Sequence, residues 1–232
     1  MSDLYLRTEA LIGKESLVRL KGAHVAVFGL GGVGGYAVEA LARAGVGRLT
    51  LVDGDDISES NLNRQIIALN STVGQGKVEA FCERIKEINP ECIVDARHLI
   101  FDEKTAQDFD FSTFSYVIDA IDTVSAKILL IKCAKDAGVP IVSCMGTGNR
   151  IRADFKIGDV SLTKGCALAR VMRKELKSRG ISGVDVLYSE TPARSVVADD
   201  SHGRHAPASI SYVPGIAGLM LAQHVITWLI EE

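Results

Sequence analysis

The feature that most constrains the fold of this chain is a glycine-rich turn, Gly29-Leu-Gly31-Gly32-Val-Gly34, which fits the pattern G-x-G-x-x-G. A short β-branched run at 24–28 precedes it, and a segment with helical spacing at 35–44 follows it. The first glycine of such a turn allows a tight bend, the second lets the backbone approach a phosphate, and the third lets helix and strand pack closely. The pattern predicts a nucleotide-binding strand–turn–helix unit.

Strands and helices alternate over the first 150 residues. Apolar runs at 48–53, 93–100, 115–119 and 139–143 predict further strands, and periodic segments at 8–21, 77–88 and 124–136 predict helices. This alternation predicts right-handed βαβ crossovers. We therefore expect an α/β fold, a Rossmann-like and mostly parallel sheet with helices on both faces.

The charge balance changes along the chain. Residues 1–150 carry 16 Lys and Arg against 20 Asp and Glu, a net charge of −4, whereas residues 151–232 carry 10 against 9, a net charge of +1. We expect an ATP-binding core at 1–150 and, at 151–232, a C-terminal extension of the same domain. Residues 213–230 are apolar but contain Pro214, Gly215 and His224, which favours a buried closing helix over a membrane span.

The cysteines indicate a reducing compartment. Five are scattered along the chain and none forms a C-x-x-C pair: Cys82, Cys92, Cys133, Cys144 and Cys166. This argues against a disulfide framework and against a zinc site built from paired cysteines. The N-terminus has no apolar core of a secretory signal. We predict a cytoplasmic protein without zinc and without a membrane segment.

An acid ends the second predicted strand. Asp53 stands where such folds hold ribose hydroxyls, a geometry that NAD and ATP share, so a dehydrogenase or a non-catalytic nucleotide sensor stays open. Two cations, Arg64 and Lys77, follow it, and a dehydrogenase needs no cations aimed at a triphosphate. Lys77 begins a predicted helix, where the macrodipole disfavours a cation unless an anion binds there. The alternatives are that Lys77 is solvated and that Arg64 pairs with Asp55 or Asp56.

Together with Asp119-Ala-Ile-Asp122, this pattern resembles the adenylating domain shared by ubiquitin-activating enzymes and their bacterial relatives, over about residues 5–150. In that family a substrate carboxylate attacks the α-phosphate of Mg-ATP, giving an acyl adenylate and pyrophosphate. The resemblance implies ATP and Mg²⁺, with a monovalent cation (Na⁺ or K⁺) as a further ligand. It assigns to the nucleotide Gly29, Gly31, Gly32, Gly34, Asp53, Asp55, Asn61, Arg64, Gln65 and Lys77.

The same resemblance implies three catalytic residues. Arg64 and Lys77 would stabilise the charge that develops during phosphoryl displacement, and Asp122 would coordinate Mg²⁺. Asp119 and Asp122 also follow the end of a predicted strand, where open α/β sheets bind ligands. The alternatives are a structural Asp119 and an Asp122 that caps a helix. Arg7 resembles an arginine that the family lends across a dimer interface to the partner's ATP, which implies a homodimer.

The C-terminal extension contains a basic helix. Residues 164–180 carry six basic side chains against one acid, and four of them, Arg170, Arg173, Lys174 and Lys177, recur at helical spacing. We predict that this face contacts the phosphates of tRNA, with an ordinary solvated helix face as the alternative. Three further residues would add positive potential: His202, Arg204 and His205.

Four stretches extend the resemblance over nearly the whole chain. Residues 143–149 (SCMGTGN), 167–180 (ALARVMRKELKSRG), 186–190 (VLYSE) and 208–218 (ASISYVPGIAG) are similar to the tRNA threonylcarbamoyladenosine dehydratases. That family adenylates the threonyl carboxylate of a modified adenosine beside the anticodon. The ureido nitrogen or oxygen of the same group then closes a ring, with net loss of water. The implied partner is tRNA that carries threonylcarbamoyladenosine.

A different member of the superfamily is the alternative, an adenylating activator of a ubiquitin-like sulfur carrier. Such enzymes usually hold zinc in two C-x-x-C pairs, which this chain lacks. Cys166 is the one cysteine of the C-terminal third, either reactive or simply a small residue that opens a helix. Some dehydratases carry a cysteine where this chain has Val184-Asp-Val-Leu, so a sulfur-relay partner is not expected. Ring closure within one substrate needs no covalent enzyme intermediate.

Overall fold

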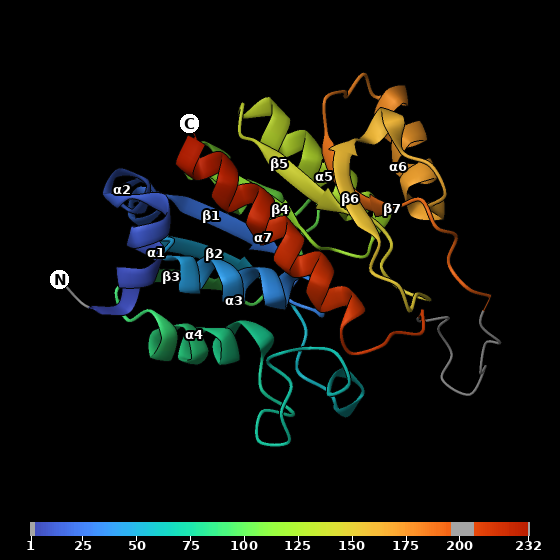
Figure 1. Ribbon diagram of the computed structural model, residues 1–232. Coiled ribbons are helices and arrows are strands. Elements are labelled where there is room, and N and C mark those ends of the chain that lie inside the picture. Colours follow the sequence, from blue (N-terminus) through green and yellow to red (C-terminus); the bar gives the residue numbers. More distant parts are fainter. Residues whose placement is uncertain (1–2, 196–206, 232) are drawn as a thin grey trace.

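A seven-stranded sheet organises the computed structural model, which describes residues 3–195 and 207–231 (Figure 1). The strand order is β3-β2-β1-β4-β5-β7-β6, and only the β6–β7 pair is antiparallel. Helices cover both faces, so the predicted Rossmann-like α/β fold is confirmed. His202, Arg204 and His205 lie outside the described residues.

The first half of the sheet consists of two βαβ units. They contain β1 (His24–Phe28), α3 (Gly34–Ala44), β2 (Arg48–Val52), α4 (Lys77–Ile88) and β3 (Ile93–Arg97). β1 is buried along its whole length, as expected for an apolar strand at the centre of a covered parallel sheet. The predicted strand at 93–100 is too long, because the backbone N–H of Leu99 turns back onto the carbonyl of Arg97, 3.0 Å away.

The second half lies on the other side of β1. β4 (Tyr116–Asp119) pairs with β1 in parallel, and α5 (Val124–Asp136) leads to β5 (Ile141–Cys144). The direction of the chain across the sheet therefore reverses between β1 and β4, and such a switch point opens a crevice at the carboxyl ends of the two strands. Phenylalanines of the segment before β4 pack on Phe28 of β1 beneath this crevice.

The C-terminal extension continues the same sheet. β6 (Phe155–Asp159) and β7 (Asp185–Ser189) join beyond β5, and α6 (Ala167–Ser178) connects them on the face of α5. α7 (Val213–Glu231) crosses the opposite face along α3. A Cβ on Gly218 would lie 2.1 Å from the carbonyl oxygen of Val33, so the two helices touch through a glycine. α7 has the length and hydropathy of a membrane span, yet half of that span is buried in the protein.

The opening helix differs from the prediction. Instead of one helix at 8–21, the structure has α1 (Leu6–Ile12) and α2 (Lys14–Gly22), separated at Gly13. Gly13 has φ 82°, a left-handed conformation that glycine adopts at little cost, and it ends the first helix. Short 3-10 turns complete the chain: η1 (Asp3–Tyr5), η2 (Glu59–Asn61), η3 (Ala106–Asp108), η4 (Phe111–Thr113) and η5 (Val160–Leu162).

Candidate active site

A cleft of about 1360 Å³ opens at the carboxyl ends of β1, β2, β4 and β5, over the switch point of the sheet. Ten of the predicted site residues line it: Gly29, Gly31, Gly32, Asp53, Asp55, Asn61, Arg64, Gln65, Lys77 and Asp122. Residues more than 90 positions apart thus meet in one place, because parallel strands deliver their carboxyl ends to the same edge.

The glycine-rich turn is pressed against the chain that leaves β4. A Cβ on Gly29, whose φ is 87°, would lie 2.6 Å from the carbonyl oxygen of Ala120. A Cβ on Gly34 would lie 1.8 Å from the carbonyl oxygen of Gly29, so Gly34 supports the turn from beneath and does not line the cleft. The Leu30 N–H donates to Asp53 Oδ2 over 2.6 Å, which ties the turn to the end of β2.

Lys77 lies in the wall of the cleft between two carboxylates. Its Nζ is 2.7 Å from Asp55 Oδ2 and 3.3 Å from Asp53 Oδ1, and the residue is buried. The interpretation of Lys77 as a solvated residue is therefore wrong. These carboxylates supply the negative charge that stabilises a cation at the start of α4. From the sequence, a bound anion alone was expected to supply that charge.

Arg64 follows η2 and presents donors to the cleft. Its Nη1 donates to the Ser60 carbonyl and to Asn63 Oδ1, both over 2.9 Å. It forms no ion pair with Asp55 or Asp56, so that alternative is wrong. Within the described part of the chain its Nε and Nη2 make no hydrogen bond, which leaves three N–H groups of the guanidinium fork for an anion.

Asn61 and Gln65 shape the same wall. Asn61 Oδ1 accepts from the Ser58 N–H, which closes a capping box around η2. The Oε1 atom of Gln65 is buried and has no hydrogen-bond partner in residues 3–195 and 207–231. A buried amide oxygen without a donor is costly, and a ligand donor in the cleft would remove that cost.

A buried ion pair supports the floor of the cleft. Asp119 and Lys127 are fully buried, with Lys127 Nζ 3.0 Å from Asp119 Oδ2. Asp119 Oδ1 accepts from the N–H of Ile121 over 3.1 Å, and Lys127 Nζ donates to the carbonyl of Ile121 over 2.8 Å. Ser143 Oγ also donates to Asp119 Oδ2, over 2.5 Å. The pair thus holds both backbone groups of Ile121, and Asp119 is structural.

Asp122 follows this clamped residue and points to solvent at the cleft. Its one described partner is the Thr123 hydroxyl, which donates to Oδ1 over 3.1 Å. Thr123, not Asp122, is the N-cap of α5, so the capping alternative is wrong. In the described ranges no cluster of three His, Cys, Asp or Glu side chains could hold a metal ion. A single exposed carboxylate still fits Mg²⁺, which is usually bound by one or two carboxylates together with substrate phosphates.

The far half of the cleft is more apolar. Leu129, Met145 and Leu168 line it together with residues 146–148, and Leu168 places the first turn of α6 at the rim. Cys144 and Cys166 are buried in this region. Burial raises the pKa of Cys144 to about 12, so this thiol stays protonated. Cys166 is the N-cap of α6 and packs in the core. This agrees with the alternative that Cys166 is simply a small residue that opens a helix.

The basic helix is amphipathic, as predicted. Ala169, Met172 and Leu176 face the core, whereas Arg170, Lys174 and Lys177 are exposed. Arg173 is half-buried, and its Nη1 donates to the carbonyl oxygen and the hydroxyl of Thr163, over 2.5 and 2.8 Å. The exposed stripe therefore has three of the four predicted members, and none of the four lines the cleft.

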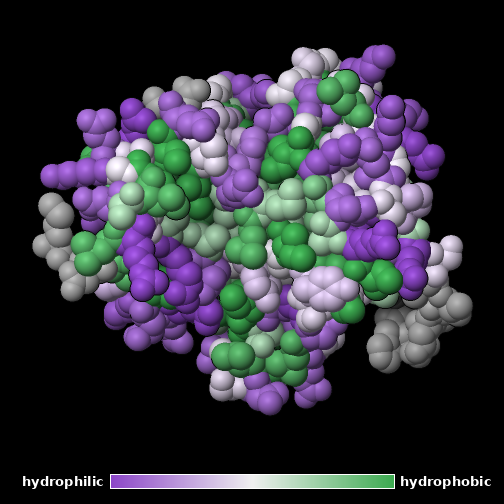
Figure 2. Space-filling model, in the orientation of Figure 1, coloured by the Kyte–Doolittle hydropathy of each residue, from purple (hydrophilic) through white to green (hydrophobic). Residues whose placement is uncertain are grey.

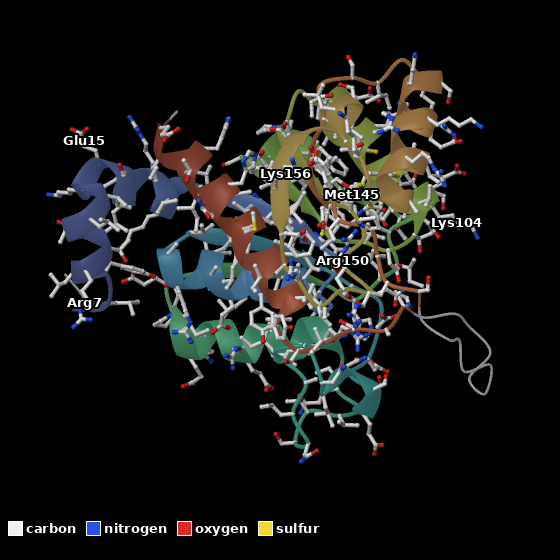
Figure 3. All side chains as sticks on the ribbon, turned by 45° about the vertical axis from the view of Figure 1, so that its right-hand side comes forward. Arg7, Glu15, Lys104, Met145, Arg150 and Lys156 are labelled. Carbon is white, nitrogen blue, oxygen red and sulfur yellow. The ribbon has the colours of Figure 1, made fainter. Side chains whose placement is uncertain are left out.

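Arg7 does not reach the cleft of its own chain. It is exposed on α1, and Figure 3 shows it on the opposite side of the molecule from Met145 and Lys104, which line the cleft. Lys127 and Lys104 are the residues that sequence reasoning missed. A single lysine in a helix or loop carries no signal for burial or for a cleft, although Lys127 stands one helical turn after the Asp119–Asp122 motif.

Comparison with known proteins agrees with this geometry. The model of the ThiF family matches residues 5–232. A tRNA threonylcarbamoyladenosine dehydratase of Bacillus subtilis is 43% identical over 245 residues, covering 100% of this chain and 96% of the relative. The Salmonella typhimurium molybdopterin-synthase adenylyltransferase is 40% identical over 141 residues, covering 61% of this chain and 55% of that relative.

Solved structures show the same relationship over the whole fold. The crystal structure of Escherichia coli tRNA N6-threonylcarbamoyladenosine dehydratase in complex with ATP has a TM-score of 0.88 at 33% identity, covering 98% of this chain and 93% of that one. The same protein in complex with AMP has a TM-score of 0.89 at 33% identity, covering 99% and 97%. The chain belongs to the ThiF family.

Proposed function

We propose that the protein is an ATP-dependent tRNA threonylcarbamoyladenosine dehydratase. The observation that carries the proposal is the cleft at the switch point, where a glycine-rich turn, Asp53, Arg64, Lys77 and Asp122 meet. The dehydratases named above support the choice of substrate, because their similarity extends over the C-terminal extension as well as the nucleotide-binding half.

The nucleotide would lie across the glycine-rich turn. Asp53 would face the ribose hydroxyls, which would share its oxygens with the donors already bound there, the N–H groups of Leu30 and Asp55 and the ammonium of Lys77. The open Nε and Nη2 of Arg64, with Lys77 behind them, would neutralise phosphate oxygens as their charge grows. Mg²⁺, when bound by Asp122 and the phosphates, supplies further charge neutralisation. The predicted monovalent cation is part of this proposal, and assays in sodium and in potassium salts test it.

The reaction then has two steps. A carboxylate oxygen of the threonyl group attacks the α-phosphorus of ATP, the bond to the bridging oxygen breaks, and pyrophosphate leaves. The ureido nitrogen or oxygen next attacks the activated carbonyl carbon, a ureido N–H loses its proton, and AMP leaves with the former carboxylate oxygen. Because both groups belong to one side chain, the closure is intramolecular and needs positioning more than a nucleophile from the protein.

A homodimer is part of the proposal. Arg7 is exposed and lies far from its own cleft, which is compatible with a role in the cleft of a second copy. Apolar side chains gather at the surface over α7 and the N-terminal helices (Figure 2), and Leu6, Leu11, Val18 and Leu219 are 60%, 86%, 61% and 48% exposed. Exposed apolar groups of this kind are compatible with an interface between protein chains.

The decisive experiment combines substrate and reaction. Incubation with Mg-ATP and tRNA that carries threonylcarbamoyladenosine should lower the mass of the modified nucleoside by one water and release AMP. Arg64→Ala and Asp122→Ala should abolish turnover with an unchanged circular dichroism spectrum. Wild-type turnover in these variants would refute their roles. If the wild-type protein binds Mg-ATP but leaves the mass of the modified nucleoside unchanged, the proposed function is refuted.

Activation of a ubiquitin-like sulfur carrier is the second candidate, favoured by the similarity of 61% of this chain to a molybdopterin-synthase adenylyltransferase. It predicts that a small carrier with a C-terminal Gly-Gly stimulates ATP–pyrophosphate exchange. The dehydratase reaction that we propose needs no such carrier and no sulfur-relay partner. A tRNA substrate would place the reaction in the cytoplasm.

A further inference from the structure

A second pocket adjoins the cleft, and three of its seven lining residues are arginines, although most of its accessible wall is apolar. It has a volume of about 360 Å³, and its walls are Asn149, Arg150, Ile151, Arg152, Thr191, Pro192 and Arg194. One loop separates it from the cleft, since residues 146–148 line the cleft and residues 149–152 line the pocket. No carboxylate lines this pocket in the described part of the chain, although the whole protein has a net charge of −3.

Arg150 is held rigidly by neutral groups. The residue is 7% exposed, its Nε donates to the Gly146 carbonyl over 3.2 Å, and its Nη1 donates to Ser189 Oγ over 2.9 Å and to the Thr191 carbonyl. Nη2 makes no hydrogen bond within residues 3–195 and 207–231. A buried guanidinium normally has an anionic partner, because an uncompensated buried charge is costly. Asp154 lies near this network: hydrogen bonds from Thr191 and Ser189, and then the charge of Arg150, lower its pKa. Asp154 therefore compensates part of the buried charge, but it does not line the pocket.

Asn149 fixes the backbone around the pocket. Its φ of 57° is left-handed, a conformation that asparagine tolerates better than most residues. Its N–H and side-chain Oδ1 bind the carbonyl and the N–H of Ala208, both over 2.7 Å, and its carbonyl accepts from the N–H of Arg194 over 2.8 Å. This clasp joins three segments and brings Arg194 to the same pocket as Arg150 and Arg152. The pocket is thus a built feature rather than a chance grouping of surface side chains.

We propose that this arginine pocket binds a backbone phosphate of the tRNA, next to the nucleotide whose carboxylate enters the cleft. The inference rests on the proposed function. A phosphodiester carries one negative charge and two free oxygens, which the planar guanidinium fork matches. The shared loop links the two sites: Gly146 lines the cleft and its carbonyl holds Arg150. Phosphate contacts of this kind fix the register of a nucleic acid without reading its sequence.

The test compares matched charge deletions in the full-length protein. Arg152→Ala and Arg194→Ala should each weaken binding of the modified tRNA several-fold, and the double variant should weaken it roughly 10-fold. The slope of log K against log salt should become shallower by about one for the lost phosphate contact. Arg48→Ala removes the same charge at the exposed amino end of β2, in the half of the sheet away from β6 and β7, and should leave binding unchanged.

The readouts separate this proposal from the function itself. Thermal stabilisation by Mg-ATP should be equal in wild type and all four variants, because none of the altered residues lines the cleft. If the double variant keeps wild-type turnover, tRNA affinity and salt slope, the pocket proposal is overturned and the proposed function is not. An equal loss in Arg48→Ala would also overturn it, as a general charge effect. A wild-type protein that binds no tRNA would overturn both proposals.

Discussion

Lys127→Met tests the buried ion pair beneath the cleft. Lys127 and Asp119 are both 0% exposed, and the variant keeps the apolar stem of the side chain while it removes the ammonium group. Asp119 then keeps the hydrogen bonds from Ser143 and Ile121 but loses its counter-charge, and the Ile121 carbonyl loses its donor. Removing one partner of a buried pair costs about 3–5 kcal/mol, which includes groups left unpaired.

The assays are equilibrium unfolding in urea, which gives the free energy of unfolding, and thermal unfolding, which gives the midpoint temperature, both followed by circular dichroism. For a chain of this size, a loss of about 4 kcal/mol lowers the thermal midpoint by roughly 8–16 °C. The double variant Lys127→Met/Asp119→Asn removes both charges and should be more stable than the single variant, because no charge is then buried without a partner. Lys132→Met is the matched control on the same helix, since its pair with Asp136 is exposed, and it should leave the midpoint unchanged.

Two results would contradict this reasoning. A Lys127→Met protein within about 1 kcal/mol of wild type would mean that the buried carboxylate needs no counter-charge. A double variant less stable than the single variant would mean that the Asp119 carboxylate acts mainly through its hydrogen bonds. If the clamp positions Asp122, a folded Lys127→Met protein should need more Mg²⁺ for half-maximal turnover, with ATP binding less affected.

Three further outcomes are expected. Gly34→Ala should lower the free energy of unfolding by about 1–3 kcal/mol and remove thermal stabilisation by Mg-ATP, because its Cβ would lie 1.8 Å from a carbonyl oxygen of the glycine-rich turn. Gly22→Ala is the control: its Cβ would have no atom within 4 Å, so neither effect is expected. Cys144, whose pKa burial raises to about 12, should resist iodoacetamide at pH 8 in peptide mapping of the native protein, and alkylation at the unfolded rate would contradict this. Burial, and secondarily the charge of Arg48, lowers the pKa of His24 in the folded protein. As the pH falls through 6.5, this imidazole is therefore protonated in the unfolded chain before it is protonated in the folded protein. Urea midpoints should therefore decrease between pH 7.5 and 5, and His24→Gln should lose part of that dependence; an identical pH profile would refute the assignment.

The sequence determined the local elements and the chemistry of the nucleotide end. Glycine spacing, the apolar run before it and Asp53 after it report on neighbours within about 30 residues, so periodicity and motif were sufficient for them. The resemblance added Arg64, Lys77 and Asp122, which all line the cleft. Boundaries were less predictable: Gly13 divides the opening helix, and the strand after residue 93 ends at Arg97.

Only the tertiary structure decided the partners of the charged residues. Lys77 lies between Asp53 and Asp55, Lys127 is buried on Asp119, Arg173 turns inward to Thr163, and Arg150 faces a pocket without a carboxylate. A lysine or arginine has the same local pattern whether it is solvated, paired or held for a ligand. Its role depends on which distant strands and loops surround it, and that depends on the order of strands across the sheet, which no local pattern encodes.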